Sequence, residues 1–273
     1  RCAPLVRVHS RKIMVFSDIS DGPLRLRRSQ TAGADFIVDT NYKVIHEDED
    51  VLILDKPSPL AVHPVGAYSE LNLHSLLKKD PRWQNTQLRF VHRLDAETSG
   101  VICAAKTREA ARLLGIQFLK AQVEKKYRAL VFGSPPHAED VIVYRLGNDL
   151  SSGFQTVRVR DEQNGEEAAT RYRVIFTTGA YSYLEIIPLT GRTHQIRAHL
   201  ALIGCPIVGD KIYIDLNIFR DYVLHGLNGK MLARLKLARL ALHAASLRFR
   251  HPRTNEEMEF ISQPPPFILQ VLP

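Results

Sequence analysis

Short runs of hydrophobic residues, separated by turn-forming residues, predict several strands. Val51–Leu54 is a continuous apolar run that stops at Lys56-Pro57-Ser58-Pro59, and this pattern is typical of a buried strand that enters a loop. Arg171–Phe176 and Tyr181–Ile186 flank a Thr-Gly-Ala turn, so they are predicted to form a hairpin. A further strand is predicted at Tyr127–Phe132, which a Gly-Ser-Pro-Pro segment closes.

Helical spacing of apolar residues appears in four places. A short helix is predicted over Asn72–Lys79, and a longer one follows Thr107, whose hydroxyl suits an N-cap. Thr193–Ile203 predicts another helix, with Gly204 at its C-terminal end. Residues 217–237 carry a helix-like pattern as one segment.

The mixture of strands, helices and hairpin signals predicts the fold class. Interspersed elements of this kind favour an α+β architecture, with a large mixed, mostly antiparallel sheet flanked by helices and loops. The pattern becomes regular near Tyr42, so residues 41–273 are predicted to form one domain. Residues 1–40 are poorly patterned apart from a strand signal at Lys12–Phe16, and we interpret them as an N-terminal extension or the remnant of an accessory module.

Composition narrows the class of protein. The chain of 273 residues has 37 Lys and Arg against 29 Asp and Glu, and the net charge of +8 favours a polyanionic partner, nucleic acid first. Charge alone also allows a module that binds DNA or an anionic protein. The 3 cysteines lack CxxC spacing, which argues against a disulfide framework and a structural zinc site. With no secretory signal and no apolar stretch of membrane-spanning length, we expect a cytoplasmic protein without a membrane partner.

His92–Gly100, with the sequence His-Arg-Leu-Asp-Ala-Glu-Thr-Ser-Gly, is the segment richest in candidate chemistry. Asp95 follows Arg93 by two residues and stands on a loop between two strand-like segments, where catalytic residues are often found. Its carboxylate is suited to act as a nucleophile or a base, and Arg93 is suited to an anionic substrate. From local spacing alone, a solvated surface loop explains the segment equally well.

Leu189–Leu200 is a second segment with polar residues that a core does not need. The start of its predicted helix would present backbone amides and Arg192 to an anion such as a phosphate. Arg197 lies three residues after His194 and therefore shares its helix face. His194 and His199 are separated by five residues, which places them on different faces, so we predict no metal site.

Five segments, in order along the chain, resemble the RluA-type family of RNA pseudouridine synthases over about residues 42–273. The loop around Asp95 has the family's H-R-L-D-x-x-T-S-G signature, and Gly191–Arg197 matches a later family motif. The remaining matches are Asp55-Lys56-Pro57 with His63-Pro64, Lys126-Tyr127-Arg128-Ala129-Leu130, and Leu242-His243-Ala244. One such match is weak, whereas five in order are highly specific.

The resemblance implies the pseudouridine synthase fold and an enzyme that isomerises specific uridines in RNA without a cofactor or metal. It implies that Asp95 is the catalytic carboxylate, acting either at C6 of the base or at C1′ of the ribose. By the same carry-over, Arg197 pairs with Asp95, and Tyr127 stacks on the target base and helps to move the C5 proton.

The resemblance also implies substrate-binding residues and partners. Arg93 is expected to fill the space left by the flipped nucleotide, and Leu242 to form an apolar wall of the pocket or part of the core. Lys56 and Arg192 are further expected to bind substrate. We expect a monomer. Many relatives that modify rRNA carry an S4-type domain, and residues 1–40 are too few for an intact one, although upstream sequence could be missing; rRNA and tRNA therefore both stay open as substrates. The alternative is an inactive RNA-binding protein with the same fold.

Overall fold

Strands and short helices alternate along the chain, as the hydrophobic pattern predicts. The computed structural model describes residues 6–8, 13–15, 27–29 and 36–272. These form two compact units: the first includes Ile37–Arg128 and Leu242–Pro266, and the second includes Ala129–Ala241. The boundary between the units falls within strand β9 (Glu124–Phe132).

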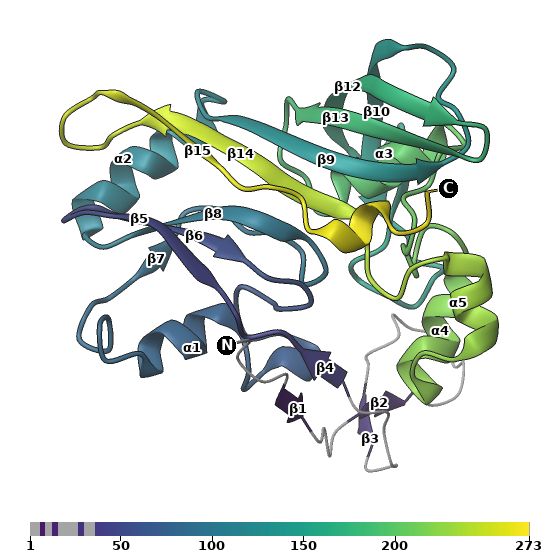
Figure 1. Ribbon diagram of the computed structural model, residues 1–273, viewed down its shortest axis with the longest axis horizontal. Coiled ribbons are helices and arrows are strands. Elements are labelled where there is room, and N and C mark those ends of the chain that lie inside the picture. The colour runs from purple at the N-terminus through teal and green to yellow at the C-terminus, as the bar shows by residue number, and fades with distance from the viewer. Residues whose placement is uncertain (1–5, 9–12, 16–26, 30–35, 273) are drawn as a thin grey trace. The chain divides into compact units, whose positions relative to one another are not determined.

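The first unit is built on a mixed sheet with the strand order β9-β14-β8-β6-β5 (Figure 1). β15 also pairs with β14, and β7 with β8. β14 and β8 run parallel, whereas β6 is antiparallel to both β5 and β8. The elements are β5 (Lys43–Glu47), β6 (Val51–Lys56), η1 (Gly66–Tyr68), α1 (Leu73–Lys79), β7 (Arg89–Phe90), β8 (Ser99–Ala105), α2 (Arg108–Leu119), β14 (Leu242–Arg250) and β15 (Glu257–Ile261).

The core of the first unit forms around β8, in which every residue is buried. Cys103 pairs in register with Ile53 of β6 and is fully buried, so it serves as a small core residue. Ala110 and Leu114 of α2 join the same core. The helix begins where predicted, because Thr107 Oγ1 accepts a hydrogen bond from the N–H of Ala110.

The second unit has the strand order β11-β10-β12-β13-β9, and α3 contacts β10, β12 and β13. β12 and β13 form the predicted antiparallel hairpin. The elements are β10 (Glu139–Asn148), β11 (Arg158–Arg160), β12 (Glu166–Thr178), β13 (Tyr181–Pro188), α3 (Gln195–Leu202), α4 (Leu216–His225) and α5 (Gly229–Leu235), with the 3-10 helix η2 (Pro266–Leu269) further along the chain. The mixed, mostly antiparallel sheet structure confirms the predicted architecture.

The N-terminal residues contribute four short strands. β1 (Val6–Val8) pairs with β4 (Phe36–Val38), and β2 (Ile13–Val15) is antiparallel to β3 (Arg27–Ser29). β2 confirms the strand signal near residue 14, whereas most of the predicted extension lies outside the described residues. The predicted boundary near residue 40 stays a prediction.

Two predicted helices differ from those observed. The helix predicted from Thr193 begins at Gln195, because His194 adopts a left-handed φ of 54°. The segment 217–237 forms two helices rather than one, because Gly226 takes a φ of 73° and the Asn228 side chain caps a new helix. In both places a local backbone conformation outweighs the apolar periodicity.

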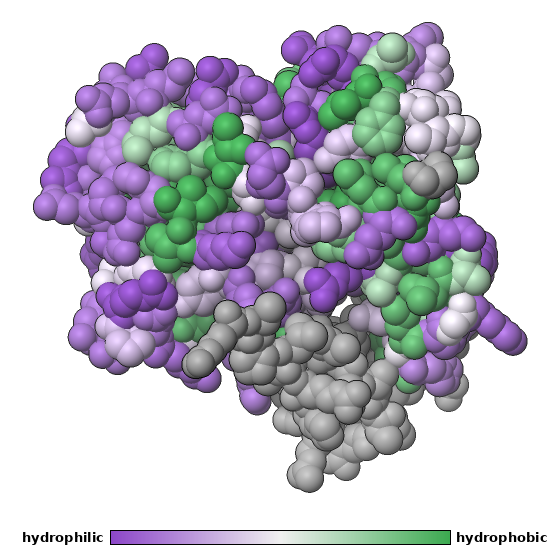
Figure 2. All heavy atoms as spheres, in the orientation of Figure 1, coloured by the Kyte–Doolittle hydropathy of each residue, from purple (hydrophilic) through white to green (hydrophobic). Residues whose placement is uncertain are grey.

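The hydropathy of the surface and the length of the helices were compared with the expectation of no membrane partner. Figure 2 shows a face on which hydrophilic residues predominate, while hydrophobic residues gather in separate groups. Among the described residues, every helix is too short or too polar to cross a membrane.

Gly100 marks the closest approach between β8 and β14. Its φ is +111°, and a Cβ atom at this position would lie 2.2 Å from the carbonyl oxygen of Ala244. Gly115 in α2 offers a contrast, because a Cβ atom there would meet no atom within 4 Å. The backbone contact therefore requires glycine at position 100 but not at position 115.

We predict that Gly100→Ala destabilises the protein by about 3 kcal/mol or more, because the added methyl group must displace buried backbone. Gly115→Ala should instead stabilise it by about 0.5–1 kcal/mol, through the better helix propensity of alanine. Urea denaturation of both variants provides the comparison. Equal stability of Gly100→Ala and the unmodified protein would contradict the proposed close packing.

His92 fastens the chain just before the Asp95 loop to β8. Its Nε2 accepts a hydrogen bond of 3.0 Å from the N–H of Cys103, and its ring stacks on Phe118 at 4.7 Å between centroids. Burial, followed by the charge of Lys125, lowers the pKa of His92 from 6.5 to about 3. The neutral imidazole is therefore the form that the fold requires.

We predict that this histidine makes the protein less stable in acid. Below pH 6.5 the unfolded imidazole takes up a proton, whereas the folded one does not until about pH 3, so stability falls as the pH falls. Between pH 7 and pH 5 the loss due to His92 should be about 2 kcal/mol. Urea titrations at both pH values should show this loss in the unmodified protein and its absence in His92→Gln. Identical pH profiles would exclude the effect.

Candidate active site

The loop that carries Asp95 is held to the segment that follows β6. The N–H of Leu60 donates to the carbonyl of Ala96 at 2.8 Å, and Ser58 Oγ donates to the carbonyl of Glu97 at 2.6 Å. Within the loop, the N–H of Thr98 donates to the carbonyl of Asp95 at 3.1 Å, which closes a turn. These bonds hold the backbone of Asp95 and of the residues that follow it, so the loop is ordered before any substrate binds.

Lys56 also holds the Asp95 loop through hydrogen bonds from its ammonium group. The residue is completely buried, and its Nζ donates to the carbonyls of Pro57, Leu60 and Ala96 at 2.9, 2.7 and 3.2 Å. Burial lowers the pKa of Lys56 to about 7, against the charges of Asp95, Asp55 and Asp39. The predicted role in binding substrate stays a prediction, but the contacts of this ammonium are those of a residue that holds the loop.

β8 and β14 meet where the Asp95 loop ends. Ser99 Oγ lies 2.9 Å from His243 Nδ1, and His243 Nε2 lies 3.0 Å from the carbonyl oxygen of Ser262. Because a carbonyl only accepts, Nε2 carries the proton and Nδ1 accepts from the hydroxyl. Leu242, the first residue of β14, is buried, which suits either a pocket wall or the core.

Tyr127 lies on β9 and is influenced by Asp95 within the same unit. The side chain is buried, and burial followed by the charge of Asp95 raises the pKa of the phenol. The hydroxyl is therefore neutral at ordinary pH. A carboxylate and a neutral aromatic ring thus act on one another in the first unit, although they are 32 residues apart in sequence.

Arg93, in contrast, is exposed. Its charge helps to lower the pKa of His63, after burial and the neighbouring His74. The rings of His63 and Phe90 meet edge to face at 5.5 Å. The guanidinium therefore lies within electrostatic range of a ring cluster formed by His63, His74 and Phe90.

Arg197 belongs to the second unit, where it forms a bidentate pair with Asp210. The Nε and Nη2 atoms donate to the two carboxylate oxygens at 2.7 and 2.8 Å, and the guanidinium lies 5.2 Å from the Tyr213 ring centroid. Both members of the pair are buried. The predicted pair between Arg197 and Asp95 joins residues of different units and stays a prediction.

Asp210 was missed by the sequence analysis. The available signal was one acidic residue two positions after the apolar run Ile207-Val208, where an unpaired carboxylate would be costly. The pKa of Asp210 is lowered, because the pairing with Arg197 and two backbone hydrogen bonds outweigh burial. An ionised carboxylate therefore orients Arg197.

Arg192 also has acidic and carbonyl partners in the second unit. Its Nη1 lies 3.0 Å from Glu166 Oε1, and its Nε donates to the carbonyl of Glu167 at 3.1 Å. The N–H of Arg192 donates to Gln195 Oε1 at 3.0 Å. A phosphate at the start of α3 would have to compete with these bonds, so the anion site expected there stays a prediction.

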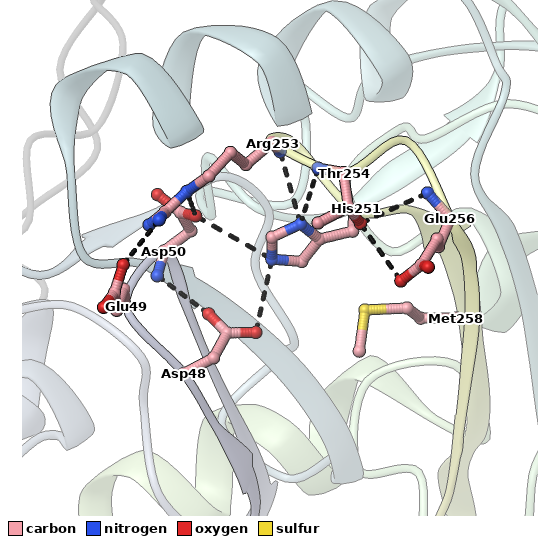
Figure 3. A pocket seen from close by; sticks show the side chains of 8 residues that line it. All are labelled: Asp48, Glu49, Asp50, His251, Arg253, Thr254, Glu256 and Met258. Carbon is pink, nitrogen blue, oxygen red and sulfur yellow. Dashed lines mark hydrogen bonds and ion pairs between the residues drawn. The ribbon is translucent and has the colours of Figure 1, made fainter.

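One group of candidate metal ligands occurs among the described residues, formed by Asp48, Asp50 and His251 (Figure 3). His251 Nδ1 accepts hydrogen bonds from the N–H groups of Arg253 and Thr254 at 3.3 and 3.2 Å. A neutral ring then carries its proton on Nε2, which lies 3.2 Å from Asp48 Oδ2. A metal ligand needs a lone pair at that atom instead.

Arg253 completes this cluster. Its Nε donates to Asp50 Oδ2 at 2.6 Å, so a cation already neutralises the second carboxylate. The side chains in Figure 3 thus form a network of charges and protons that ties the β14–β15 turn to the residues before β6.

Comparison with known proteins identifies the family. The sequence profile of RNA pseudouridylate synthase matches residues 50–202. Ribosomal large subunit pseudouridine synthase C of Pasteurella multocida (strain Pm70) is 37% identical over 236 residues, which cover 84% of this chain and 67% of that protein. The protein of the same name from Escherichia coli (strain K12) is 38% identical over 218 residues, which cover 79% of this chain and 64% of that protein. The chain thus spans about two thirds of the length of these relatives.

Solved structures agree with the sequence matches. Human RNA Pseudouridylate Synthase Domain Containing 4 superposes with a TM-score of 0.64 at 28% identity, covering 83% of this chain and 90% of that one. Human RNA Pseudouridylate Synthase Domain Containing 1 gives 0.63 at 26% identity, covering 82% and 83%. Profile, relatives and fold agree, and the chain belongs to the RNA pseudouridylate synthase family, in its RluA-type branch.

Proposed function

We propose that this chain isomerises uridine to pseudouridine in RNA, with Asp95 as the catalytic carboxylate. The observation that carries the proposal is that Asp95 lies within electrostatic range of Tyr127, whose pKa is raised by burial first and then by the charge of that carboxylate. A flipped base needs an aromatic ring on which it can stack and, for this reaction, a carboxylate close to that ring. The intact His92–Gly100 signature supports the same assignment.

The reaction is an isomerisation, so it needs no other reactant. The bond between N1 of uracil and C1′ of the ribose breaks, and a bond between C5 and C1′ forms. The proton on C5 leaves, and N1 gains one. Asp95 acts as a nucleophile either at C6 of the base or at C1′, and the detached uracil must stay in the pocket while it turns. Confinement of this kind lowers barriers by roughly 7–11 kcal/mol in favourable cases.

Tyr127 is suited to hold the uracil face. Its raised pKa keeps the phenol neutral, so stacking and hydrogen bonding are its principal contributions. A proton transfer from C5 through this residue would need a phenolate, which the nearby carboxylate disfavours. We therefore assign Tyr127 to stacking first.

The remaining residues are assigned around the flipped nucleotide. Extrusion of a base costs a few kcal/mol, and a planar guanidinium such as that of Arg93 can replace the lost stacking. Arg93 is exposed, as this role requires. Leu242 would form an apolar wall, while Lys56 holds the Asp95 loop and Arg192 contacts RNA only by exchanging Glu166 for a phosphate.

Large-subunit rRNA is the proposed substrate class. The curated relatives carry the name ribosomal large subunit pseudouridine synthase C, which favours rRNA over tRNA. Pseudouridine profiling of total RNA, in cells with and without the gene, identifies the modified uridine. Loss of a site in rRNA supports the proposal, whereas a site lost only in tRNA corrects the substrate. The expected monomeric and cytoplasmic state stays a prediction.

We predict that Asp95→Asn abolishes pseudouridine formation while RNA binding persists. The amide keeps the shape of the side chain but removes its charge, and loss of a catalytic carboxylate costs roughly 10⁴-fold in turnover. Glu109→Gln removes one exposed negative charge from α2 and serves as the control. Pseudouridine is measured by mass spectrometry of digested RNA. An active Asp95→Asn variant would refute the assignment, and an inactive unmodified protein that still binds RNA would favour the alternative function.

For Arg197 we predict a larger effect on turnover than on RNA binding. Because Arg197→Met also leaves Asp210 buried and unpaired, the variant should lose about 3–5 kcal/mol of stability. The double variant Arg197→Met with Asp210→Asn removes that unpaired charge, so stability should largely return while turnover should not. Thermal unfolding and single-turnover assays separate the two effects. Recovery of turnover in the double variant would show that Arg197 has only a structural role.

A further inference from the structure

Lys125 is a partly buried lysine whose ammonium is not neutralised by any of the residues that the structure describes. Among the residues that the structure describes, none forms a hydrogen bond or ion pair with its Nζ. The side chain has intermediate exposure, and its Nζ is not one of the enclosed polar atoms that lack a partner, so the ammonium reaches solvent. A cation in this position is open to an anion from outside.

The position of Lys125 connects it to the proposed active site. Successive side chains of a strand point to opposite faces, so Lys125 and Tyr127 of β9 lie on the same face. The charge of Lys125 also lowers the pKa of His92, three residues before Asp95. The ammonium therefore lies within electrostatic range of the chain that leads into the catalytic loop.

Lys126, its neighbour, has the opposite environment. Its Nζ lies 3.1 Å from Glu124 Oε1, and its side chain points to the other face of β9. Glu124 in turn pairs with Arg248 at 2.6 Å. Within the described part of the chain, the charge of Lys126 is therefore balanced by a carboxylate and that of Lys125 is not.

Burial without a partner has a cost that a ligand can offset. Burial lowers the pKa of Lys125, because the charged ammonium is less well solvated in the protein than in water. Contact with an anion would restore the charged form and release counterions from that anion. In a protein of net charge +8 that belongs to an RNA-modifying family, the phosphate backbone is the matching anion.

We propose that Lys125 binds a phosphate of the RNA strand that enters beside Tyr127, and that Lys126 does not. The inference rests on the proposed function for its location, because the strand is positioned by the uridine that reaches Asp95. A lysine supplies a point charge rather than base recognition, so its contribution is sequence-independent. It holds the strand beside the pocket while Arg93 and Tyr127 engage the target nucleotide.

The test measures binding of a uridine-only RNA oligonucleotide as a function of KCl concentration. Lys125→Met removes the charge but keeps an apolar stem of similar length, and Lys126→Met is the matched control with the same change in composition. Lys125→Met should lower the slope of log Kd against log salt by about 0.7 and weaken binding about tenfold at low salt. Lys125→Arg should retain most of the affinity, and Lys126→Met should leave the slope unchanged.

An experiment on the unmodified protein avoids any dependence on folding of the variants. An amine-acetylating reagent is applied with and without the oligonucleotide, and modification is located by mass spectrometry. RNA should protect Lys125 and leave Lys126 unchanged. Equal protection of both lysines, or a slope equally affected by both substitutions, overturns the proposal. Since neither readout requires isomerisation, an absence of pseudouridine formation would contradict the proposed function without affecting this result.

Discussion

The backbone contact between Gly100 and Ala244 is the constraint on which the candidate site depends. β8 and β14 run parallel at this point and approach so closely that no side chain fits between them. Asp95 lies five residues before Gly100, so the loop that carries it ends where β8 is held most tightly. The Ser99–His243 contact at 2.9 Å adds a polar link at the same level. The proposed catalytic loop, on such a rigid support, would need little reorganisation when substrate binds.

Within each unit, the buried cations differ in the groups that satisfy their charge. Lys56 directs its ammonium at three carbonyls and so holds the loop, whereas Arg197 is oriented by the two oxygens of Asp210. Lys125 has neither kind of partner among the described residues. A buried cation is stable when carbonyl or carboxylate oxygens of the protein balance its charge. Where they do not, as at Lys125, an anion from outside is expected to bind. Arg253 Nε in the same way balances the carboxylate of Asp50.

Local sequence signals predicted most of the elements correctly. Thr107 and Asn72 cap their helices through side-chain hydrogen bonds that depend only on neighbouring residues. The hairpin of β12 and β13 follows from alternation and a short turn. The signals failed where a backbone conformation interrupts the pattern, as at His194 and Gly226, because apolar spacing does not report the sign of φ.

The sequence by itself determined the family, the carboxylate of Asp95 and the excess of positive charge, because motifs and composition are properties of the chain. Only the tertiary structure decided which of those charges are neutralised. Asp210 and Arg197 are 13 residues apart and Lys56 meets the carbonyl of Ala96 across 40 residues, so no local pattern records either contact. Adjacent lysines 125 and 126 are chemically identical in sequence, and the alternation of β9 sends one toward Glu124 and leaves the other with its charge unbalanced among the described residues. The partners and the burial of each charged side chain depend on contacts between residues far apart in sequence, so only the folded structure shows them.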